Sequence, residues 1–469
     1  MIDLLLILLI IPIFGCLFVL AAQKNSMNAF YVTLFTLVGN IMAILALLPQ
    51  VINMPNDAVQ NYTYNWLEVA NIEFVFGADV FSLLLLLAVY VALLIGAVGL
   101  LPVQRKDKSC LLLGLYFMWC MTGFLIARDM VSFYIFFAAM LVSLFMLIGM
   151  AVTIRKTSIL YTFFAFGLGG VLMLLSATLI IYHFSHANIG LPEIALVAMP
   201  KQAALVVWLC VCAAFLSRIP IWPLHHWFAV IGGAIKNPLV YIIMNLWPLT
   251  GIYGFMRFWQ LTIPENAVNF LPMVMIFGIL TMLFAALIGV GHKEFLPKLF
   301  SYSAVYYLLF LLAIVFLDAK YTQNIVYSLF IFIIVNATLT VLELWSENAC
   351  ELNNCDYRGV WGYTPRLFRI LVFFVLVAVG LPISSMFWNN FVLISALFKQ
   401  HFAAGIGVMF AITLTSMGLA HELLMMHKPA KTMTTSGNIS DISDGQTMFF
   451  MALIMLLLLS FFNPLWFVF

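Results

Sequence analysis

The chain has 469 residues, of which 65% are hydrophobic and only 8% are charged, and its formal net charge is +2. Soluble domains carry roughly a quarter of charged residues and need a largely polar surface, so a water-soluble fold is excluded. The small net charge without a basic cluster also argues against a nucleic-acid-binding protein. We therefore expect an all-α polytopic protein that lies almost entirely within a lipid bilayer.

We predict about fourteen transmembrane helices, because apolar stretches long enough to cross ~30 Å of hydrocarbon recur along the whole chain. In chain order they cover residues 2–22, 28–52, 79–103, 110–127, 130–153, 158–184, 203–231, 238–259, 267–290, 299–317, 322–345, 367–398, 402–425 and 447–468. Their continuous apolar character excludes a transmembrane β-barrel, in which polar and apolar residues alternate. The first stretch lacks a basic segment and a cleavage site, so we expect a retained helix rather than a signal peptide.

The basic residues predict how these helices are oriented. Most of the 20 Lys and Arg residues fall in loops after odd-numbered stretches, among them Arg105, Lys106, Lys293 and Lys298. Since loops rich in Lys and Arg stay on the cytoplasmic side, both termini are expected on the non-cytoplasmic side. We expect a bacterial inner membrane rather than the mitochondrial inner membrane.

Two of the stretches contain residues that break a helix. Pro220 and Pro223 interrupt the seventh stretch, and Gly380 and Pro382 interrupt the twelfth. Proline removes a backbone donor, and a membrane tolerates the freed carbonyls where they line a cavity or are buried in protein. Single proline kinks are common in membrane helices. Two breaks five stretches apart favour an inverted repeat of stretches four to eight and nine to thirteen.

We accordingly divide a single membrane domain, residues 1–469, into four consecutive parts. They are the N-terminal helices at 1–103, the first repeat at 104–260, the second repeat at 261–428, and a loop with the C-terminal helix at 429–469. Each repeat would contain five helices, the fourth of which is broken.

Seven cysteines are present, most of them inside the apolar stretches, where a free thiol behaves as a small apolar group. Cys350 and Cys355 lie in a loop that we expect in the cytoplasm. A single pair of cysteines at this spacing, without a second pair nearby, is weak evidence for a metal site. Reduced thiols are the expected state in the cytoplasm. The sequence shows no nucleotide-binding loop, nucleophile–base set, haem ligands or iron–sulfur ligands, so neither a cofactor nor a metal is expected in this chain.

Six motifs carry a resemblance to a known family. They are Ala78-Asp-Val-Phe-Ser-Leu83, Arg128-Asp-Met-Val-Ser-Phe-Tyr-Ile-Phe-Phe137, Arg218-Ile-Pro-Ile-Trp-Pro-Leu-His-His-Trp227, Tyr253-Gly-Phe-Met-Arg-Phe258, Lys298-Leu-Phe-Ser-Tyr-Ser303 and Gly380-Leu-Pro382. With these motifs in this order, the chain resembles the antiporter-like subunits of respiratory complex I and of Mrp-type cation antiporters. The resemblance covers nearly the whole chain. The resemblance is strongest to NADH dehydrogenase subunit 4, which is called subunit M in bacteria.

The resemblance implies two inverted five-helix repeats with one broken helix each, and a polar axis at mid-membrane along which protons pass. It also implies other membrane subunits as partners in a multisubunit complex. NADH, FMN, iron–sulfur clusters and quinone would be bound by those partner subunits.

The chain departs from the family at the titratable positions of that axis. Ala138, Leu249, Asn336 and Asn390 stand where the family has Glu, Lys or His, and Arg218 replaces a Lys. A relay needs groups whose pKa can pass through neutral pH, which buried Glu, Lys and His can do. Arginine keeps its proton in essentially any protein environment. Proton conduction by this subunit is therefore expected to be altered or lost.

Other polar residues are candidates for a rerouted ion path. His225 and His226 follow the break in the seventh stretch, although His225 could equally be a structural imidazole bonded to freed backbone. Glu343, His421 and Glu422 lie toward the cytoplasmic ends of stretches eleven and thirteen. They could line a half-channel, but charged residues near an interface are more often simply solvated.

Asp79 and Asp129 open the third and fifth stretches. A carboxylate at a helix N-terminus is favoured by the helix dipole, so we expect structural or ion-pairing roles for both.

Three functions remain open. The first is a membrane-arm subunit of a complex I-like, proton-translocating NADH:quinone oxidoreductase, and the second is a subunit of a Mrp-type cation/proton antiporter or a related ion-coupled uptake system. The third is a non-conducting structural paralogue that holds partner subunits. In each case the chain has no catalytic site of its own.

Overall fold

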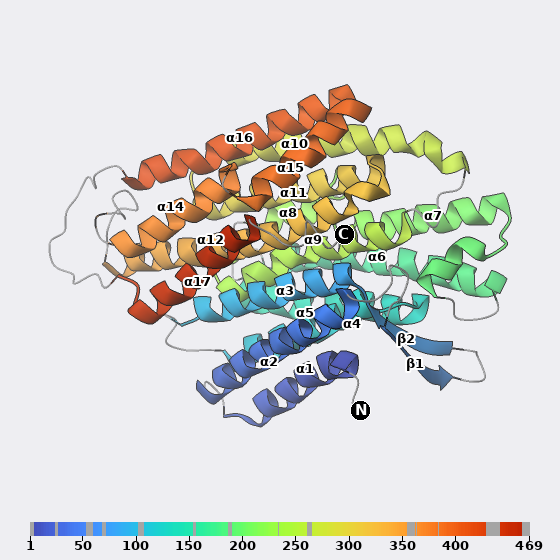
Figure 1. The fold of residues 1–469 in the computed structure, drawn as a ribbon, viewed down its shortest axis with the longest axis horizontal. Coiled ribbons are helices and arrows are strands. Elements are labelled where there is room, and N and C mark those ends of the chain that lie inside the picture. The colour runs from blue at the N-terminus through green and yellow to red at the C-terminus, as the bar shows by residue number, and fades with distance from the viewer. Residues whose placement is uncertain are drawn as a thin grey trace.

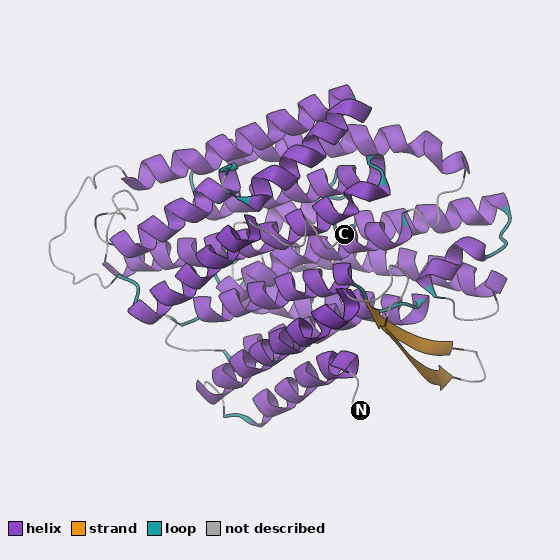
Figure 2. Cartoon of the chain, viewed as in Figure 1, coloured by secondary structure: helices purple, strands orange, loops and turns teal. Residues whose placement is uncertain are grey.

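The computed structural model of the chain describes residues 4–23, 27–52, 60–67, 72–101, 107–152, 156–185, 190–232, 234–259, 265–353, 362, 364–382, 384–427 and 441–461. In them the chain forms a layered bundle of helices that run along a common direction, with a small β-hairpin at one end (Figure 1). Figure 2 shows that almost all of the described residues lie in helices or in the hairpin.

The N-terminal part and the first repeat follow one another along the lower half of Figure 1. The N-terminal elements are α1 (Leu4–Ala21), α2 (Met27–Ile52), β1 (Gln60–Leu67), β2 (Ile72–Ala78) and α3 (Val80–Gly99). The first repeat contains α4 (Lys108–Ile126), α5 (Met130–Ala151), α6 (Lys156–Ser185), η2 (Leu191–Leu196), α7 (Lys201–Leu216), α8 (His226–Ile231) and α9 (Pro238–Phe258).

The second repeat forms most of the upper half of Figure 1, and the C-terminal helix lies near the middle of the view, on the left. Their elements are η3 (Glu265–Phe270), α10 (Leu271–Gly291), α11 (Phe295–Phe316), η4 (Ala319–Tyr321), α12 (Thr322–Asn353), α14 (Pro365–Val379), α15 (Ser385–Gln400), α16 (Phe402–His427) and α17 (Asp444–Phe461).

The predicted helical membrane fold is confirmed. Eleven helices in the described residues are long and apolar enough to cross a membrane by length and composition, namely α1 to α6, α9 to α12 and α16. The remaining three predicted stretches coincide with shorter helices, which are α7 with α8, α14 with α15, and α17. The count of fourteen spans stays a prediction.

The core of the bundle consists of α9, α11 and α12. In the apolar window of each of these helices 94% of the residues are buried, against 28% in α10 and 33% in α1. A helix in the centre of the bundle is surrounded by protein, whereas one at the edge presents much of its apolar surface to lipid. The central helices therefore hold any polar groups away from lipid.

Both predicted helix breaks are present. The chain leaves the helix after Leu216 and resumes it at His226, so Pro220 and Pro223 lie in a non-helical segment. In the second repeat, Gly380 and Pro382 lie between α14 and α15. Each break divides the fourth helix of its five-helix group, as the repeat requires.

Gly380 ends α14 in the left-handed conformation, with φ at 105°. Its N–H donates to the carbonyls of Leu376 and Val377, and the N–H of Leu381 also donates to Leu376 at 2.9 Å. These bonds satisfy carbonyls that the end of a helix would otherwise leave without a donor. A side chain is disfavoured here because a Cβ clashes with the following carbonyl at this φ.

The Gly380→Ala variant is expected to lose about 1–2 kcal/mol of folding free energy, since an L-residue pays this strain in the left-handed region. The measurement is the thermal unfolding midpoint of the purified protein in detergent. Gly291→Ala is the matched control, because nothing lies within 4 Å of a Cβ there and the residue is helical. Equal midpoints for the two variants would contradict the role of the left-handed turn.

The hairpin of β1 and β2 was not expected, and it adds a β element to the all-helical prediction. The strands pair antiparallel, with Gln60 opposite Ala78 and Tyr62 opposite Phe76. Aromatic residues recur at every second position, at Tyr62, Tyr64 and Trp66 in β1 and at Phe74 and Phe76 in β2, a period that suits a strand. The hairpin matters because it ends directly at Asp79, the first residue of a charged cluster.

Candidate functional site

The break between α7 and α8 holds a buried cation. Arg218 is 0% exposed, and its Nη2 donates a 2.7 Å hydrogen bond to the carbonyl oxygen of Phe137 on α5. Its guanidinium lies 3.6 Å from the ring centroid of Phe137 and 3.5 Å from that of Trp247 on α9. The two rings therefore enclose the charge from both faces.

This arginine is stabilised without a carboxylate among the described residues. Its Nε and Nη1 atoms make no hydrogen bond to any described group. The partial negative charge at the C-terminus of α7 and the electron-rich ring faces offset part of the cost of burying the charge. Ala138, the half-buried neighbour of Phe137, offers no counter-charge.

Neutral polar groups also lie among the central helices. The Tyr307 hydroxyl on α11 donates to the carbonyl oxygen of Asn245 on α9 at 2.6 Å. One helical turn away on α11, the Ser303 hydroxyl accepts a 2.6 Å bond from Nδ2 of Asn336 on α12. On the other side of α11, Tyr306 contacts Asn390 on α15. These residues and Arg218 are called the polar row below.

The amides of the polar row have spare hydrogen-bonding capacity. The side-chain oxygens of Asn245, Asn336 and Asn390 are buried and receive no hydrogen bond from the described residues. Buried polar atoms of this kind are ordinarily bonded to internal water. Leu249, where the resemblance predicts a lysine in the family, is fully buried and apolar, and the polar residue of α9 in the row is Asn245, one turn earlier.

A buried ion pair joins α11 to α16. Lys298 and Glu422 bond directly, and their side chains are 3% and 4% exposed. The exposed His421 lies 3.8 Å from the same carboxylate oxygen through its Nδ1. The alternative that Glu422 is simply solvated near the membrane surface is therefore wrong. The position predicted for Lys298 also changes, because it lies in the first turns of α11 rather than in the loop before it.

Glu343 is also buried rather than solvated. It is 0% exposed on α12, and the Ser346 hydroxyl lies 3.3 Å from its Oε2. The long buried helix α12 extends past the predicted end of its apolar stretch, and this places Glu343 among packed helices.

The two histidines after the first break differ in their surroundings. His225 is half-buried, its Nδ1 makes no hydrogen bond to the described residues, and it lines a cavity of about 300 Å³. His226 is exposed. Of the two, His225 alone faces an internal space, and neither is in the polar row.

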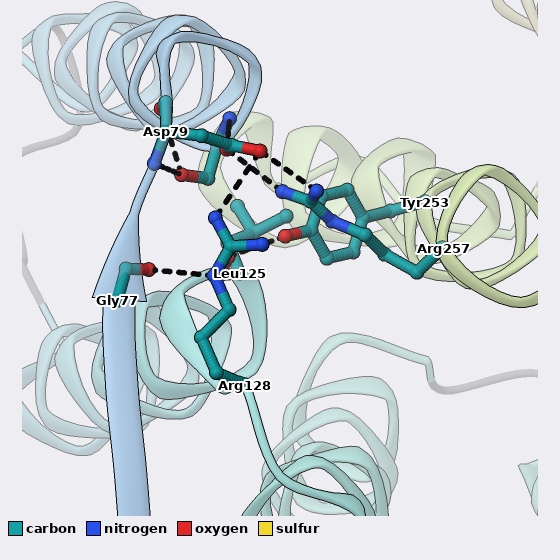
Figure 3. Close-up of polar contacts among 7 residues, drawn as sticks. Gly77, Asp79, Leu125, Arg128, Tyr253 and Arg257 are labelled. Atoms are coloured by element: carbon teal, nitrogen blue, oxygen red, sulfur yellow. Dashed lines mark hydrogen bonds and ion pairs between the residues drawn. The ribbon is translucent and has the colours of Figure 1, made fainter. Parts of the chain in front are cut away.

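A charged cluster lies at the end of the bundle that carries the hairpin (Figure 3). Asp79 accepts from both guanidinium nitrogens of Arg257 at 2.7 Å and pairs with Arg128 at 3.1 Å. The same carboxylate caps α3 by accepting from the Ser82 N–H at 2.8 Å. Asp79 thus links the starts of α3 and α5 to the end of α9.

Asp129 caps α5 in a similar way. Its Oδ2 accepts from the Ser132 N–H at 2.8 Å, and its Oδ1 accepts from the Val75 N–H of β2 at 2.8 Å. The carboxylate therefore fixes the hairpin to the start of α5.

No group of three or more His, Cys, Asp or Glu side chains that could hold a metal ion occurs in the described part of the chain. Cys355 lies outside the described residues, and the side chain of Cys350 is not described either.

The sequence matches the family described as NADH:quinone oxidoreductase/Mrp antiporter, transmembrane, over residues 127–418. The chain belongs to this family. The resemblance drawn from the six motifs is confirmed. The match runs from the end of α4 into α16, and the polar row and Lys298 lie inside it.

Similar proteins agree with the family in both sequence and fold. The NADH-ubiquinone oxidoreductase chain 4 of Marchantia polymorpha is 25% identical over 407 residues, which cover 84% of this chain and 80% of the relative. A chain of respiratory complex I from Thermus thermophilus has a TM-score of 0.84 at 21% identity and covers 97% of this chain and 94% of its own. A chain of the Mrp complex from Dietzia sp. DQ12-45-1b has a TM-score of 0.77 at 17% identity, with 94% and 86% covered.

Proposed function

We propose that this chain is a membrane-arm, antiporter-like subunit of a complex I-like, proton-translocating NADH:quinone oxidoreductase, with altered or lost proton conduction. One observation carries the proposal. The family's fold is intact, while the row of polar groups through its centre contains no side chain that titrates near neutral pH.

The fold and the relatives support the subunit role. Relatives that match about 85% of this chain by sequence carry the names NADH-ubiquinone oxidoreductase chain 4 and NADH-quinone oxidoreductase subunit M. Partner membrane subunits would complete the complex and would hold NADH, FMN, iron–sulfur clusters and quinone. The lipid-facing residues of α1 and α10 leave ample apolar surface for such neighbours.

The chemistry of the polar row supports the altered conduction. Arg218 keeps its proton and lies fixed between two rings, so it can neither accept nor release one. Asn245, Asn336 and Asn390 can hold water but cannot store a charge. A proton moving along this row meets a permanent positive charge at one end and no titratable group beyond it.

A rerouted path is the first alternative within this function. Candidate groups for such a path are Lys298, Glu422, His421 and Glu343 in the second repeat, and His225 near the first break. Lys298 and Glu422 differ from the polar row because both can change protonation state. They would make a half-channel on the cytoplasmic side.

Two other functions fit the same fold. A subunit of a Mrp-type antiporter or related ion-coupled uptake system is supported by the family description and by the Dietzia structure. A non-conducting structural paralogue is supported by the polar row, which contains no side chain that titrates near neutral pH. Genes for quinone-site and hydrogenase-like subunits beside this gene would favour the first function, and genes for small antiporter subunits would favour the second.

The distribution of basic residues supports a bacterial inner membrane with both termini on the non-cytoplasmic side. In this orientation the Asp79 cluster and the hairpin lie on the non-cytoplasmic side, and the Lys298–Glu422 pair lies toward the cytoplasm.

The test is proton flux in liposomes that contain the purified chain. We expect the wild type to dissipate a pH gradient little faster than empty liposomes, and the Ala138→Glu/Arg218→Lys double variant to conduct several-fold faster. The reason is that the variant restores a titratable pair where α5 meets the first break. Each single variant is a control, because one titratable group without its partner leaves the pair incomplete.

If the wild type conducts as well as a family member with an intact charged axis, the loss of conduction and the structural-paralogue function are both refuted. A rerouted path would then be required.

A further inference from the structure

The cavity beside the first helix break has no role in the functions proposed above. It has a volume of about 300 Å³, at the lower end of ordinary ligand pockets, which hold about 300–1,000 Å³. α8, α10 and α11 form its walls, with the aromatic rings of Phe228, Phe284 and Phe300 among them. Polar groups on the wall are few, so the cavity suits a hydrocarbon better than an ion.

Its long dimension follows α10. The lining residues of this helix run from Thr281, at mid-helix, to His292, in the turn before α11. That distance is roughly 16 Å at a helical rise of about 1.5 Å per residue. Half of a ~30 Å hydrocarbon layer is about 15 Å, the reach of one acyl chain. The cavity therefore extends from the membrane surface to the middle of the bilayer.

The inner end is closed by the helix break. Pro220 lines it, and the N–H of Trp222 donates to the Thr281 hydroxyl at 2.9 Å, which fixes the break against the middle of α10. The side toward lipid is open, because the wall residues Phe284 and Ile288 are 53% and 37% exposed. α10 lies at the edge of the bundle (Figure 1). A chain could enter sideways from the bilayer.

The outer end offers polar partners for a head group. His292 lines the cavity and is exposed, and the exposed Lys293 follows it in the turn between α10 and α11. The exposed Glu294 stands next to them, so the turn is not purely basic. Imidazole and ammonium donors at the level of lipid head groups suit a phosphate.

We propose that this cavity holds one acyl chain of a membrane phospholipid, whose phosphate lies at His292 and Lys293. The bound chain covers His225, which lines the cavity and whose buried Nδ1 has no hydrogen-bond partner among the described residues. It thereby keeps water away from the first break and from the neighbouring Arg218. The lipid is a structural component of the subunit and seals the break.

The first test counts lipids that stay with the purified full-length chain, by native mass spectrometry and by mass analysis of extracted lipid. The Ala285→Phe variant fills the cavity, and Ala403→Phe adds the same bulk on the exposed face of α16. We expect the wild type and Ala403→Phe to retain one phospholipid more per chain than Ala285→Phe. Equal retention by all three, or an isoprenoid quinone in place of the phospholipid, overturns the proposal.

The second test needs no variant that could misfold. The wild-type chain is placed in vesicles of phosphatidylglycerol and phosphatidylethanolamine that contain a phospholipid with a photoreactive group at its chain end. Ala304 is the lining residue of α11 farthest from the turn and is only 3% exposed, whereas Leu280 on α10 is 57% exposed and marks ordinary lipid contact. We expect adducts at both residues. Adducts at Leu280 without any at Ala304 overturn the proposal.

Discussion

The Asp79→Asn variant is expected to lose about 3–5 kcal/mol of folding free energy, the usual cost of removing one partner of a buried ion pair. Arg128 and Arg257 share this carboxylate, and the three side chains are between 11% and 22% exposed. Without it two guanidinium groups face each other in a partly desolvated site, and α3 loses its cap. The measurement is chemical unfolding of the purified chain in detergent.

The matched control is Asp318→Asn, which breaks a pair with Lys320 whose side chains are 60% and 66% exposed. An exposed pair contributes about 0–1 kcal/mol, so this variant should unfold almost as the wild type does. Adding Arg257→Gln to Asp79→Asn should recover part of the loss, because it removes one of the two uncompensated cations. If both aspartate variants lose the same amount, the cluster does not stabilise the fold.

The Lys298→Met variant is expected to lose about 3–5 kcal/mol as well, because it leaves the Glu422 carboxylate buried and unpaired. Replacing both residues with apolar ones, as in Lys298→Met/Glu422→Leu, should return stability to within about 1 kcal/mol of the wild type, since apolar replacement of a whole buried pair is often neutral. The measurement is again chemical unfolding, read as a double-mutant cycle.

Arg366→Gln is the control for a lost cation, since its pair with Asp444 has side chains that are 49% and 89% exposed. Additive losses in the Lys298 and Glu422 variants would show that the two residues are not coupled. The double variant also separates two roles of the pair. If it is stable and the complex retains its proton flux, the pair is structural, and if flux is lost, Lys298 and Glu422 belong to the ion path.

The helices and their breaks could be predicted because their signals are local. Crossing a hydrocarbon layer requires a long apolar stretch, and Pro220 and Gly380 disturb the backbone wherever they occur in a helix. The helix N-caps could also be predicted, since Asp79 and Asp129 directly precede apolar helices. The alternating aromatic residues of β1 and β2 were an available signal for the hairpin, but they lie in a segment between helices where no strand is required.

The burial of the charged side chains could not be predicted from the sequence in the same way. Lys298 and Glu422 are 124 positions apart in the sequence, and each alone is an ordinary charged residue near the end of a membrane helix. Glu343 is similar, and its burial depends on neighbours that pack around α12. Asn245 and Tyr307 belong to the polar row through a bond between α9 and α11, for which neither helix has a sequence signal.

The sequence by itself determined that the chain is a helical membrane protein of this family, and the resemblance predicts that the titratable groups of the family's axis are replaced in it. It could do so because hydropathy, helix breaks and residue identity belong to single segments. Only the tertiary structure decided where each remaining charge lies. Arg218 is enclosed by rings from two other helices, Asp79 holds two arginines, and Lys298 and Glu422 pair across α11 and α16. The reason is that the cost of a buried charge depends on partners brought together by helix packing, which sequence spacing does not specify.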